Sequence, residues 1–196
     1  MKDLKELTKL LINVDMVNGF VKEGAMADSY IQHIVPEHIR LMKKIIEGQE
    51  GVAIIKDTHK QECREFNRFP AHCIEETEEA ELIEELKVFE EDALIYKKNS
   101  TSTMYAPNFI EDIDKMKSLN EIIIIGCCTD ICILNLAIPL QNYFDQKDLN
   151  VKITVPKNAV ETYDAPYHNR EEYNDIAFKL MKQAGINLVE TIEKGL

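Results

Sequence analysis

A chain of 196 residues with 45% hydrophobic residues is long enough to bury the core of one α/β domain. Its net charge of −12 at pH 7 argues against nucleic acid and membrane surfaces as partners. No apolar run reaches the roughly 18 residues of a membrane span, and the amino-terminal MKDLKELTKLL lacks the apolar stretch of a signal peptide. Five cysteines, an odd number, favour reduced thiols over a disulfide framework, so we expect a cytoplasmic protein.

Short apolar runs alternate along the chain with segments of helical periodicity. In chain order the sequence predicts a strand at 10–15, a helix at 30–49, a strand at 51–57, a helix at 76–86, a strand at 92–98, a helix at 107–117, a strand at 121–126, a helix at 129–146, a strand at 151–156, a helix at 169–185 and a strand at 186–191. Thr77 is a candidate N-cap, and Pro139 is expected to bend its helix. Six strands separated by helices predict one α/β domain over 1–196, with a parallel sheet covered on both faces.

Much of the negative charge lies in one segment, EETEEAELIEELKVFEED at 75–92. A solvated helix face is the ordinary interpretation of such a run, and an acidic docking surface is the alternative.

Polar and reactive residues gather where four of the predicted strands end. Asp15 follows the first strand, Asp57 ends the second, Lys98 ends the third, and the cysteines of GCCTDIC follow the fourth. Ligands of parallel α/β sheets bind outside the carboxyl ends of the strands. These residues are therefore candidates for one site, although Asp15 can also be a helix cap and Lys98 a surface lysine.

Of the three clustered cysteines, Cys132 has the better position for a nucleophile. It lies about one turn into the helix after the fourth strand, where the helix dipole favours the thiolate and lowers the pKa. Taken alone, a cysteine there is also a common core residue. Cys127 and Cys128 lie in the strand-to-helix turn and are interpreted as structural.

The segment DTHKQECREFNRFPAHC at 57–73 carries residue types that ligate metals. Asp57 and His59 form a local pair, and Glu65 and His72 can complete a mixed nitrogen and oxygen site. Many loops with two histidines bind no metal, so the residues alone leave this open.

Together these strings resemble the isochorismatase-like cysteine hydrolases, and most of all the nicotinamidases. The resemblance covers nearly the whole chain, in the order VDMVNGF, KDTHKQECREFNRFPAHC, ETEEAEL, YKKNSTSTM and GCCTDIC. It implies a six-stranded parallel sheet of order 3-2-1-4-5-6 with helices on both faces. It also implies a catalytic triad of Asp15, Lys98 and Cys132.

The resemblance assigns further roles at the same strand ends. A non-proline cis peptide would fall between Cys127 and Cys128, and the amides of Cys128 and Cys132 would form an oxyanion hole. A divalent ion, commonly zinc with manganese or iron as alternatives, would be held by Asp57, His59, His72 and Glu65, with Glu62 competing for the last position. This ion would bind the pyridine nitrogen and waters. The substrate ring would lie between Phe20 and Phe69, with Tyr105 as a further wall, although core packing also explains such aromatics.

Several departures from the family pattern concern the substrate. Val17 stands where many members have Gln, the chain has no Trp, and Glu76-Thr77 replaces a common Gly-Thr pair.

The resemblance implies hydrolysis of nicotinamide to nicotinate and ammonia through a thioester, by a protein that we expect to be a homo-oligomer. Hydrolysis of another small amide, such as an N-carbamoyl compound or ureide, is the alternative enzyme, and a catalytically silent binding protein is the other class. Isochorismatases proper lack the cysteine, so Cys132 argues against that activity.

Overall fold

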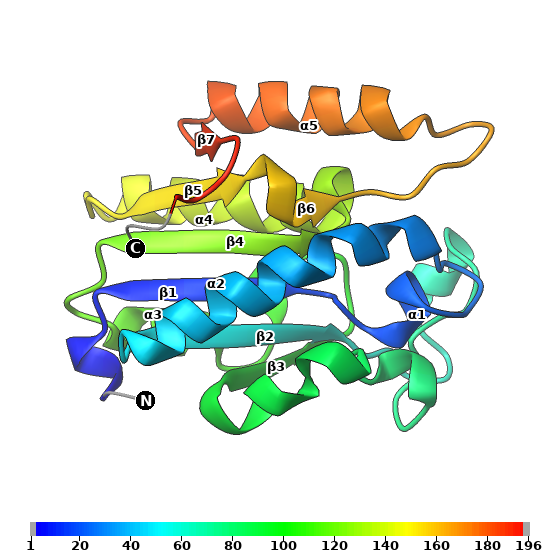
Figure 1. Cartoon of the computed structure of the whole chain (residues 1–196), viewed down its shortest axis with the longest axis horizontal. Helices are drawn as coiled ribbons and strands as arrows, with labels where there is room; N and C mark the ends of the chain where they lie inside the picture. The colour runs from blue at the N-terminus through cyan, green and yellow to red at the C-terminus, as the bar shows by residue number, and fades with distance from the viewer. Residues whose placement is uncertain (1–2, 194–196) are drawn as a thin grey trace.

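A parallel sheet with helices on both faces organises the chain, as expected from the alternating pattern (Figure 1). The computed structural model describes residues 3–193, so the ends of the predicted domain, residues 1–2 and 194–196, lie outside the described residues. The strands are β1 Lys9–Val14, β2 Gly51–Asp57, β3 Leu94–Lys98, β4 Glu121–Cys127, β5 Lys152–Pro156, β6 Val160–Glu161 and β7 Asn187–Val189. The helices are α1 Asn18–Val21, α2 Val35–Glu47, α3 Phe109–Lys115, α4 Leu134–Gln146 and α5 Arg170–Gln183.

The sheet has the order β3-β2-β1-β4-β5-β7, and all of its neighbouring strands are parallel. The predicted order is confirmed, with β7 as the sixth strand of the prediction. The two-residue strand β6 was not predicted and pairs with the end of β4. Because the strands are parallel, the carboxyl ends of β1, β2, β3 and β4 meet at one edge.

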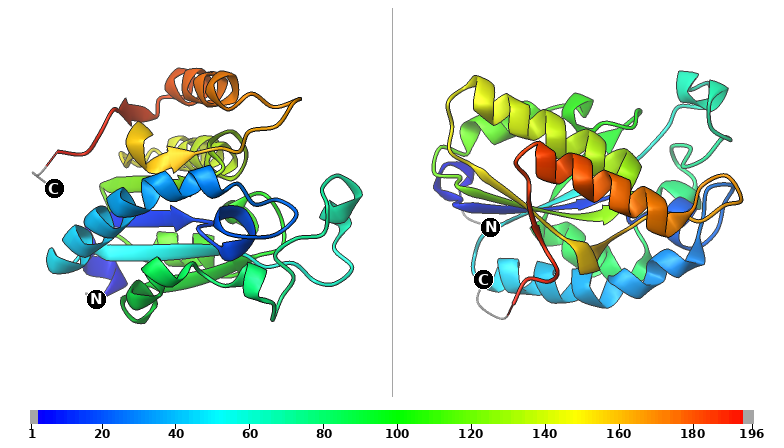
Figure 2. Two further views of the ribbon diagram at one scale, coloured as in Figure 1. Left: turned by 45° about the vertical axis from the view of Figure 1, so that its right-hand side comes forward. Right: turned by 90° about the horizontal axis from the view of Figure 1, so that it is seen from above.

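Two apolar layers hold the helices against the sheet. Alternate residues of β1, such as Leu10 and Ile12, face the layer formed by α3, α4 and α5, while Leu11 faces the layer formed by α2. The central strand β4 is buried on both faces, which explains its continuous apolar run. Figure 2 shows α2 on one side of the sheet and α4 and α5 on the other. No helix among residues 3–193 combines the length and apolarity needed to cross a membrane.

The acidic segment departs from the prediction, because no α-helix forms at 76–86. Two 3-10 helices, Glu78–Ala80 and Glu84–Asp92, stand there instead. Between them the backbone pairs with the chain after β1: Asn18 N–H donates to the Glu81 carbonyl, and Ile83 N–H donates to the Met16 carbonyl. These bonds use backbone groups that a continuous helix would need. Thr77 precedes the first 3-10 helix, but its side chain makes no capping bond.

The helix after β4 begins differently from its prediction. Residues Thr129–Ile133 form a π-helical turn, and α4 follows directly from Leu134 with Pro139 inside it. Similarly, the predicted helix at 30–49 is a 3-10 helix, Ser29–Ile34, continuing into α2. The predicted strand ends are otherwise shifted by at most a few residues, so the geometry of the edge is kept.

Candidate active site

Side chains from three strand ends and the π-helical turn converge at the carboxyl edge of the sheet. The Nζ atom of Lys98 lies 2.9 Å from Oδ2 of Asp15, 2.7 Å from Oδ1 of Asp57 and 3.8 Å from Sγ of Cys132. Lys98 and Asp57 are paired in the register of β3 and β2. All four side chains are buried. The structure therefore brings together the aspartate, lysine and cysteine that the sequence singled out.

The backbone around Asp15 explains how the carboxylate and the cysteines come close. Asp15 extends β1 by one residue, donating its N–H to the Ile55 carbonyl, and then turns with a φ of 56°. Aspartate tolerates this left-handed conformation better than most residues. Across the β1–β4 pair, a Cβ on Gly126 would lie 2.0 Å from the Val14 carbonyl oxygen. A glycine at this position therefore permits the close approach of the two strands.

The two aspartates beside Lys98 have opposite proton affinities. Burial raises the pKa of Asp15 to about 6, although Lys98 acts against this shift. Burial acts in the same direction on Asp57, but Lys98 and the hydrogen bonds from His59 and His72 outweigh it and hold the pKa of Asp57 well below its usual range. Asp15 is therefore the carboxyl group that can take up and release a proton near neutral pH.

The lysine between them stays charged. Burial alone would lower the pKa of Lys98, but the two carboxylates outweigh burial and raise it well above its usual value. An ammonium buried with two partners is stabilised by both, and removal of the ammonium would leave two buried carboxylates without compensation.

The thiol of Cys132 differs from its expected state. The helix start predicts a lowered pKa, yet burial raises the pKa of Cys132 well above its usual value, and Lys98 offsets only part of this shift. The sulfur lies within the π-helical turn and is buried, so loss of hydration outweighs the helix dipole. The resting site therefore holds a neutral thiol next to a carboxylate that can accept its proton.

Asp57, His59 and His72 form a compact group of potential metal ligands, all buried. The Oδ2 atom of Asp57 lies 3.0 Å from Nε2 of His59 and 3.2 Å from Nε2 of His72, and the two Nε2 atoms are 3.2 Å apart. The opposite ring nitrogens also face oxygen atoms: His59 Nδ1 faces Asn99 Oδ1, and His72 Nδ1 faces the Pro70 carbonyl. Outer hydrogen bonds of this kind orient metal-binding histidines, so these residues fit a divalent ion.

The structure separates the two glutamates proposed as the fourth ligand. Glu65 is buried and lines the same pocket as Asp57 and His72, although it is not part of their compact group. Its carboxylate accepts a hydrogen bond from Thr101 Oγ1 at 3.0 Å. Glu62 is exposed and does not line the pocket. Of the two, Glu65 has the position that a ligand needs.

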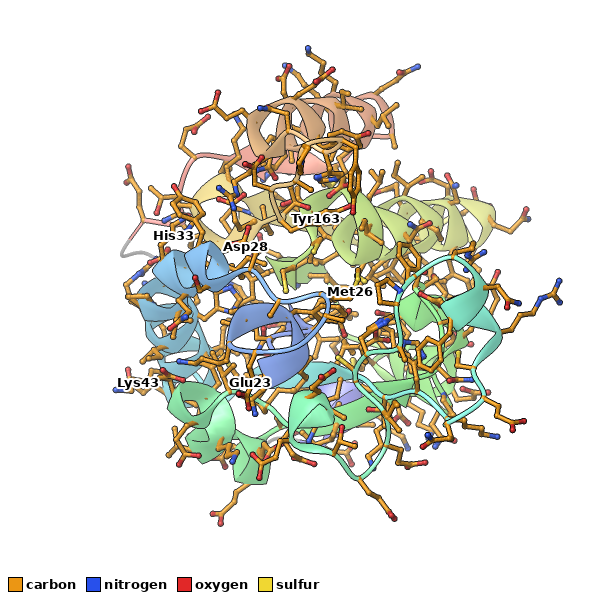
Figure 3. All side chains as sticks on the ribbon, turned by 90° about the vertical axis from the view of Figure 1, so that its right-hand side faces the viewer. Glu23, Met26, Asp28, His33, Lys43 and Tyr163 are labelled. Carbon is orange, nitrogen blue, oxygen red and sulfur yellow. The ribbon has the colours of Figure 1, made fainter. Side chains whose placement is uncertain are left out.

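Apolar side chains form the walls of the pocket above Cys132. Phe20 and Phe69 lie there, as the sequence predicts, together with Met26, Ile131 and Tyr163, which it missed. Met26 and Tyr163 come from loops and lie close together on the face shown in Figure 3. Tyr163 follows β6 at the same edge of the sheet. The strand that Tyr163 follows has only two residues and was not predicted, so the rule that ligands bind at strand ends did not point to this tyrosine.

Tyr105 is the exception among the predicted walls, because its side chain is 83% exposed and lies outside the pocket. It ends a short 3-10 helix, Thr103–Tyr105, in which Thr103 is buried and Met104 packs on the core. Just before it, Ser102 Oγ donates to the Asn135 carbonyl on α4. With this turn docked on α4, the Tyr105 ring points into solvent.

The two adjacent cysteines occupy different places. The peptide bond between Cys127 and Cys128 is cis, as the resemblance implies. Cys127 is buried and its thiol donates to the Asp15 carbonyl at 3.2 Å, whereas Cys128 lines the pocket beside Cys132. Cys127 therefore ties the turn to the end of β1, and Cys128 borders the space where a substrate would react.

The isochorismatase domain model matches residues 9–193, so the chain belongs to the isochorismatase family. Nicotinamidase 1 of Arabidopsis thaliana is 29% identical over 175 residues, which cover 81% of this chain and 71% of that protein. This relative supports grouping the chain with the hydrolases of the family.

Solved structures share the fold over nearly the full chain. The crystal structure of nicotinamidase PncA from Bacillus subtilis has a TM-score of 0.78 at 25% identity, covering 94% of this chain and 100% of that one. The pyrazinamidase of Pyrococcus horikoshii, solved in complex with zinc, has a TM-score of 0.76 at 23% identity, covering 93% and 98% of the two chains. The second likeness is one of fold alone.

Proposed function

We propose that this protein hydrolyses a small aromatic carboxamide, nicotinamide first among them, to the acid and ammonia, with Cys132 as nucleophile. The observation that carries the proposal is the contact of a neutral thiol, a proton-accepting carboxylate and a buried ammonium: Lys98 lies within 4 Å of both Asp15 and Cys132. An arrangement of nucleophile, base and charge partner within reach of one another is what covalent amide hydrolysis requires.

In the first step, Asp15 takes the proton of the Cys132 thiol as the sulfur attacks the carboxamide carbon. The Lys98 ammonium, held by Asp57, stabilises the negative charge as it passes from Asp15 to the sulfur. The backbone amides of Cys128 and Cys132 are proposed to stabilise the oxyanion, and one such donor typically contributes about 10²–10³ in rate. Protonated Asp15 then gives its proton to the leaving amine, and ammonia departs from a thioester.

In the second step, water replaces ammonia. Asp15 takes a proton from the attacking water and returns it to the sulfur as the thioester carbon–sulfur bond breaks, which releases the carboxylic acid and restores the thiol. The same aspartate acts as base and acid in both halves, and its pKa of about 6 suits both directions near neutral pH.

The proposal includes a divalent ion held by Asp57, His59 and His72 with Glu65 nearby, and zinc is the first candidate. When bound, such an ion would supply a Lewis-acidic position for a water or a substrate nitrogen at the pocket floor. Asp57 would contribute to this group through Oδ2, while Oδ1 keeps Lys98 in place. The zinc-bound pyrazinamidase with the same fold is consistent with this proposal.

The test is ammonia release from a panel of small amides, measured with and without added zinc or manganese. We expect nicotinamide to be hydrolysed fastest, and Cys132→Ala to reduce its rate by at least 10³-fold while the variant keeps the wild-type melting temperature. Cys127→Ala, which removes a buried thiol outside the pocket, is expected to lower the rate far less than Cys132→Ala does. If Cys132→Ala keeps the wild-type rate, the assignment of Cys132 as the nucleophile is refuted. A preference for an N-carbamoyl compound or a ureide would refute the substrate class.

A further inference from the structure

The proposed substrate pocket is bordered by a loop that no part of the mechanism above uses. Residues 162–170, here called the rim segment, run from β6 to the start of α5 and carry Tyr163. The cavity between the pocket walls measures about 30 Å³, which is room for one or two water molecules. The space between the walls is therefore tight for an aromatic ring, and the position of each wall side chain affects what fits there. The contacts that fix the position of the Tyr163 side chain therefore affect which substrates fit into the pocket.

His168 holds Tyr163 from within the rim segment. Its ring stacks on the Tyr163 ring at a centroid distance of 3.9 Å and an interplanar angle of 11°. Tyr173 of α5 stacks on the other face of the His168 ring, at a centroid distance of 3.7 Å. The Nδ1 atom of His168 lies 3.1 Å from the Tyr163 carbonyl oxygen. The histidine thus contacts both the ring and the backbone of the pocket wall, and it is buried.

The other ring nitrogen connects the rim segment to the turn that carries the nucleophile. Nε2 of His168 lies 2.9 Å from Oδ2 of Asp130, and Thr162 Oγ1 donates to Oδ1 of the same carboxylate at 2.5 Å. Asp130 lies two residues before Cys132 in the π-helical turn. Thr162 and His168, which lie on either side of Tyr163 in the chain, are therefore both bonded to one carboxylate beside the nucleophile.

Further bonds make the rim segment a poor candidate for free movement. Ala165 and His168 exchange two backbone hydrogen bonds of 2.9 Å, which close a tight turn. Arg170 and the Asp164 backbone N–H both bond to Asp28, two residues after Met26, the neighbouring wall. The same segment therefore supports the two loop-borne walls of the pocket.

From these contacts we infer that His168 is a positioning residue that sets the width of the substrate pocket, acting through Tyr163 and anchored by Asp130. In this arrangement Tyr163 determines specificity by size, and His168 fixes where its ring stands. Binding sites gain affinity and selectivity when their walls are held in place before the ligand arrives. The inference rests on the proposed amide hydrolysis for its kinetic test, but it also makes a prediction that needs no turnover.

The kinetic test compares nicotinamide with the bulkier 5-methylnicotinamide. We expect His168→Ala and Tyr163→Ala each to raise the kcat/KM ratio for the bulkier over the smaller amide at least fivefold, chiefly through KM. The double variant is expected to equal Tyr163→Ala alone, because His168 acts through that ring. Additive effects, or an unchanged ratio in His168→Ala, would overturn the inference. Tyr105→Ala, an exposed tyrosine outside the pocket, is the matched control and should leave the ratio unchanged.

The second test measures alkylation of Cys132 by iodoacetamide and by the bulkier 2-iodoacetanilide, with Cys132→Ala defining the background from the other thiols. We expect the wild type to favour the smaller reagent, and His168→Ala and Tyr163→Ala to reduce this preference at least threefold. An unchanged preference in both would overturn the inference even if amides are hydrolysed. If no amide is hydrolysed but the preference falls, the proposed function fails and the role of His168 stands.

Partial replacement guards against a variant that fails to fold. His168→Phe keeps a ring between the two tyrosines but loses both hydrogen bonds, and His168→Gln keeps a donor but loses the stacking. We expect both to fall between the wild type and His168→Ala in size preference, at wild-type melting temperature. Wild-type preference in both of these folded variants would overturn the inference.

Discussion

The two sides of Lys98 show how one buried cation can serve two different carboxylates. On one side, Asp15 meets Lys98 and the Cys132 thiol, and burial raises its pKa to about 6. On the other side, Asp57 meets Lys98 and two histidines, and its pKa lies well below the usual range. The residue type and the burial are the same, so the histidine donors around Asp57 and the repulsion that its charge exerts on Asp15 separate the two roles. One side is suited to moving protons and the other to holding cations.

The largest effect is expected when the shared cation is removed. Lys98→Met would leave two buried carboxylates facing each other without compensation, and breaking a buried ion pair in this way typically costs about 3–5 kcal/mol. We expect hydrolysis to be lost and the urea midpoint to fall markedly. Lys97→Met is the control, because Lys97 is an exposed neighbour on the same strand. An unchanged unfolding midpoint for Lys98→Met would contradict the assigned partnership.

The Asp15 side can be tested by pH. The ionised carboxylate is needed to accept the thiol proton, so kcat/KM is expected to rise as the pH increases through about 6 and Asp15 loses its proton. Asp15→Asn should lower the rate by about 10²–10⁴-fold, the usual range for a lost general base. It should also remove the inflection near pH 6. An inflection that persists at the same pH in Asp15→Asn would assign it to another group.

The Asp57 side can be tested by ion affinity, where a smaller effect is expected. Glu65→Gln should weaken zinc binding by about 10–100-fold, comparable to the loss of other groups that support a metal site. Glu62→Gln is its exposed counterpart three residues earlier and should bind zinc as the wild type does. Competition with a chromogenic chelator measures both. If both substitutions weaken zinc binding equally, Glu65 has no special role in the metal site.

The sequence predicted best what depends on apolar runs and their ends. Strands β2 and β4 were predicted closely because buried parallel strands have continuous apolar sequences, and the residues that follow them share one edge of the sheet. The helix predicted in the acidic segment was wrong because the backbone of this segment bonds to residues 16–18, far away in the chain. No local sequence pattern indicates such pairing. The raised pKa of Cys132 also depends on burial by other elements, which helix position alone does not reveal.

Loop residues were the least predictable part of the site. Phe20 and Phe69 were placed by the family resemblance, whereas Tyr105 was placed wrongly, because the direction of its side chain depends on how the turn Thr103–Tyr105 docks on α4. Tyr163 and His168 were missed, although both follow the end of a strand at the correct edge. Their contacts join β6, the π-helical turn and α5, and only the folded chain reveals them.

The close approach at Gly126 carries a lesson for protein engineering. The carbonyl of Val14 leaves no room for even one added carbon there, so the geometry that aligns Asp15 with the cysteines permits almost no substitution. Met26 and Tyr163 stand on loops beyond this tight junction, where replacement leaves the sheet untouched. A mutant library aimed at new substrates should therefore diversify these loops and keep the strand pair invariant, so that selectivity changes while the arrangement of Asp15, Lys98 and Cys132 is preserved.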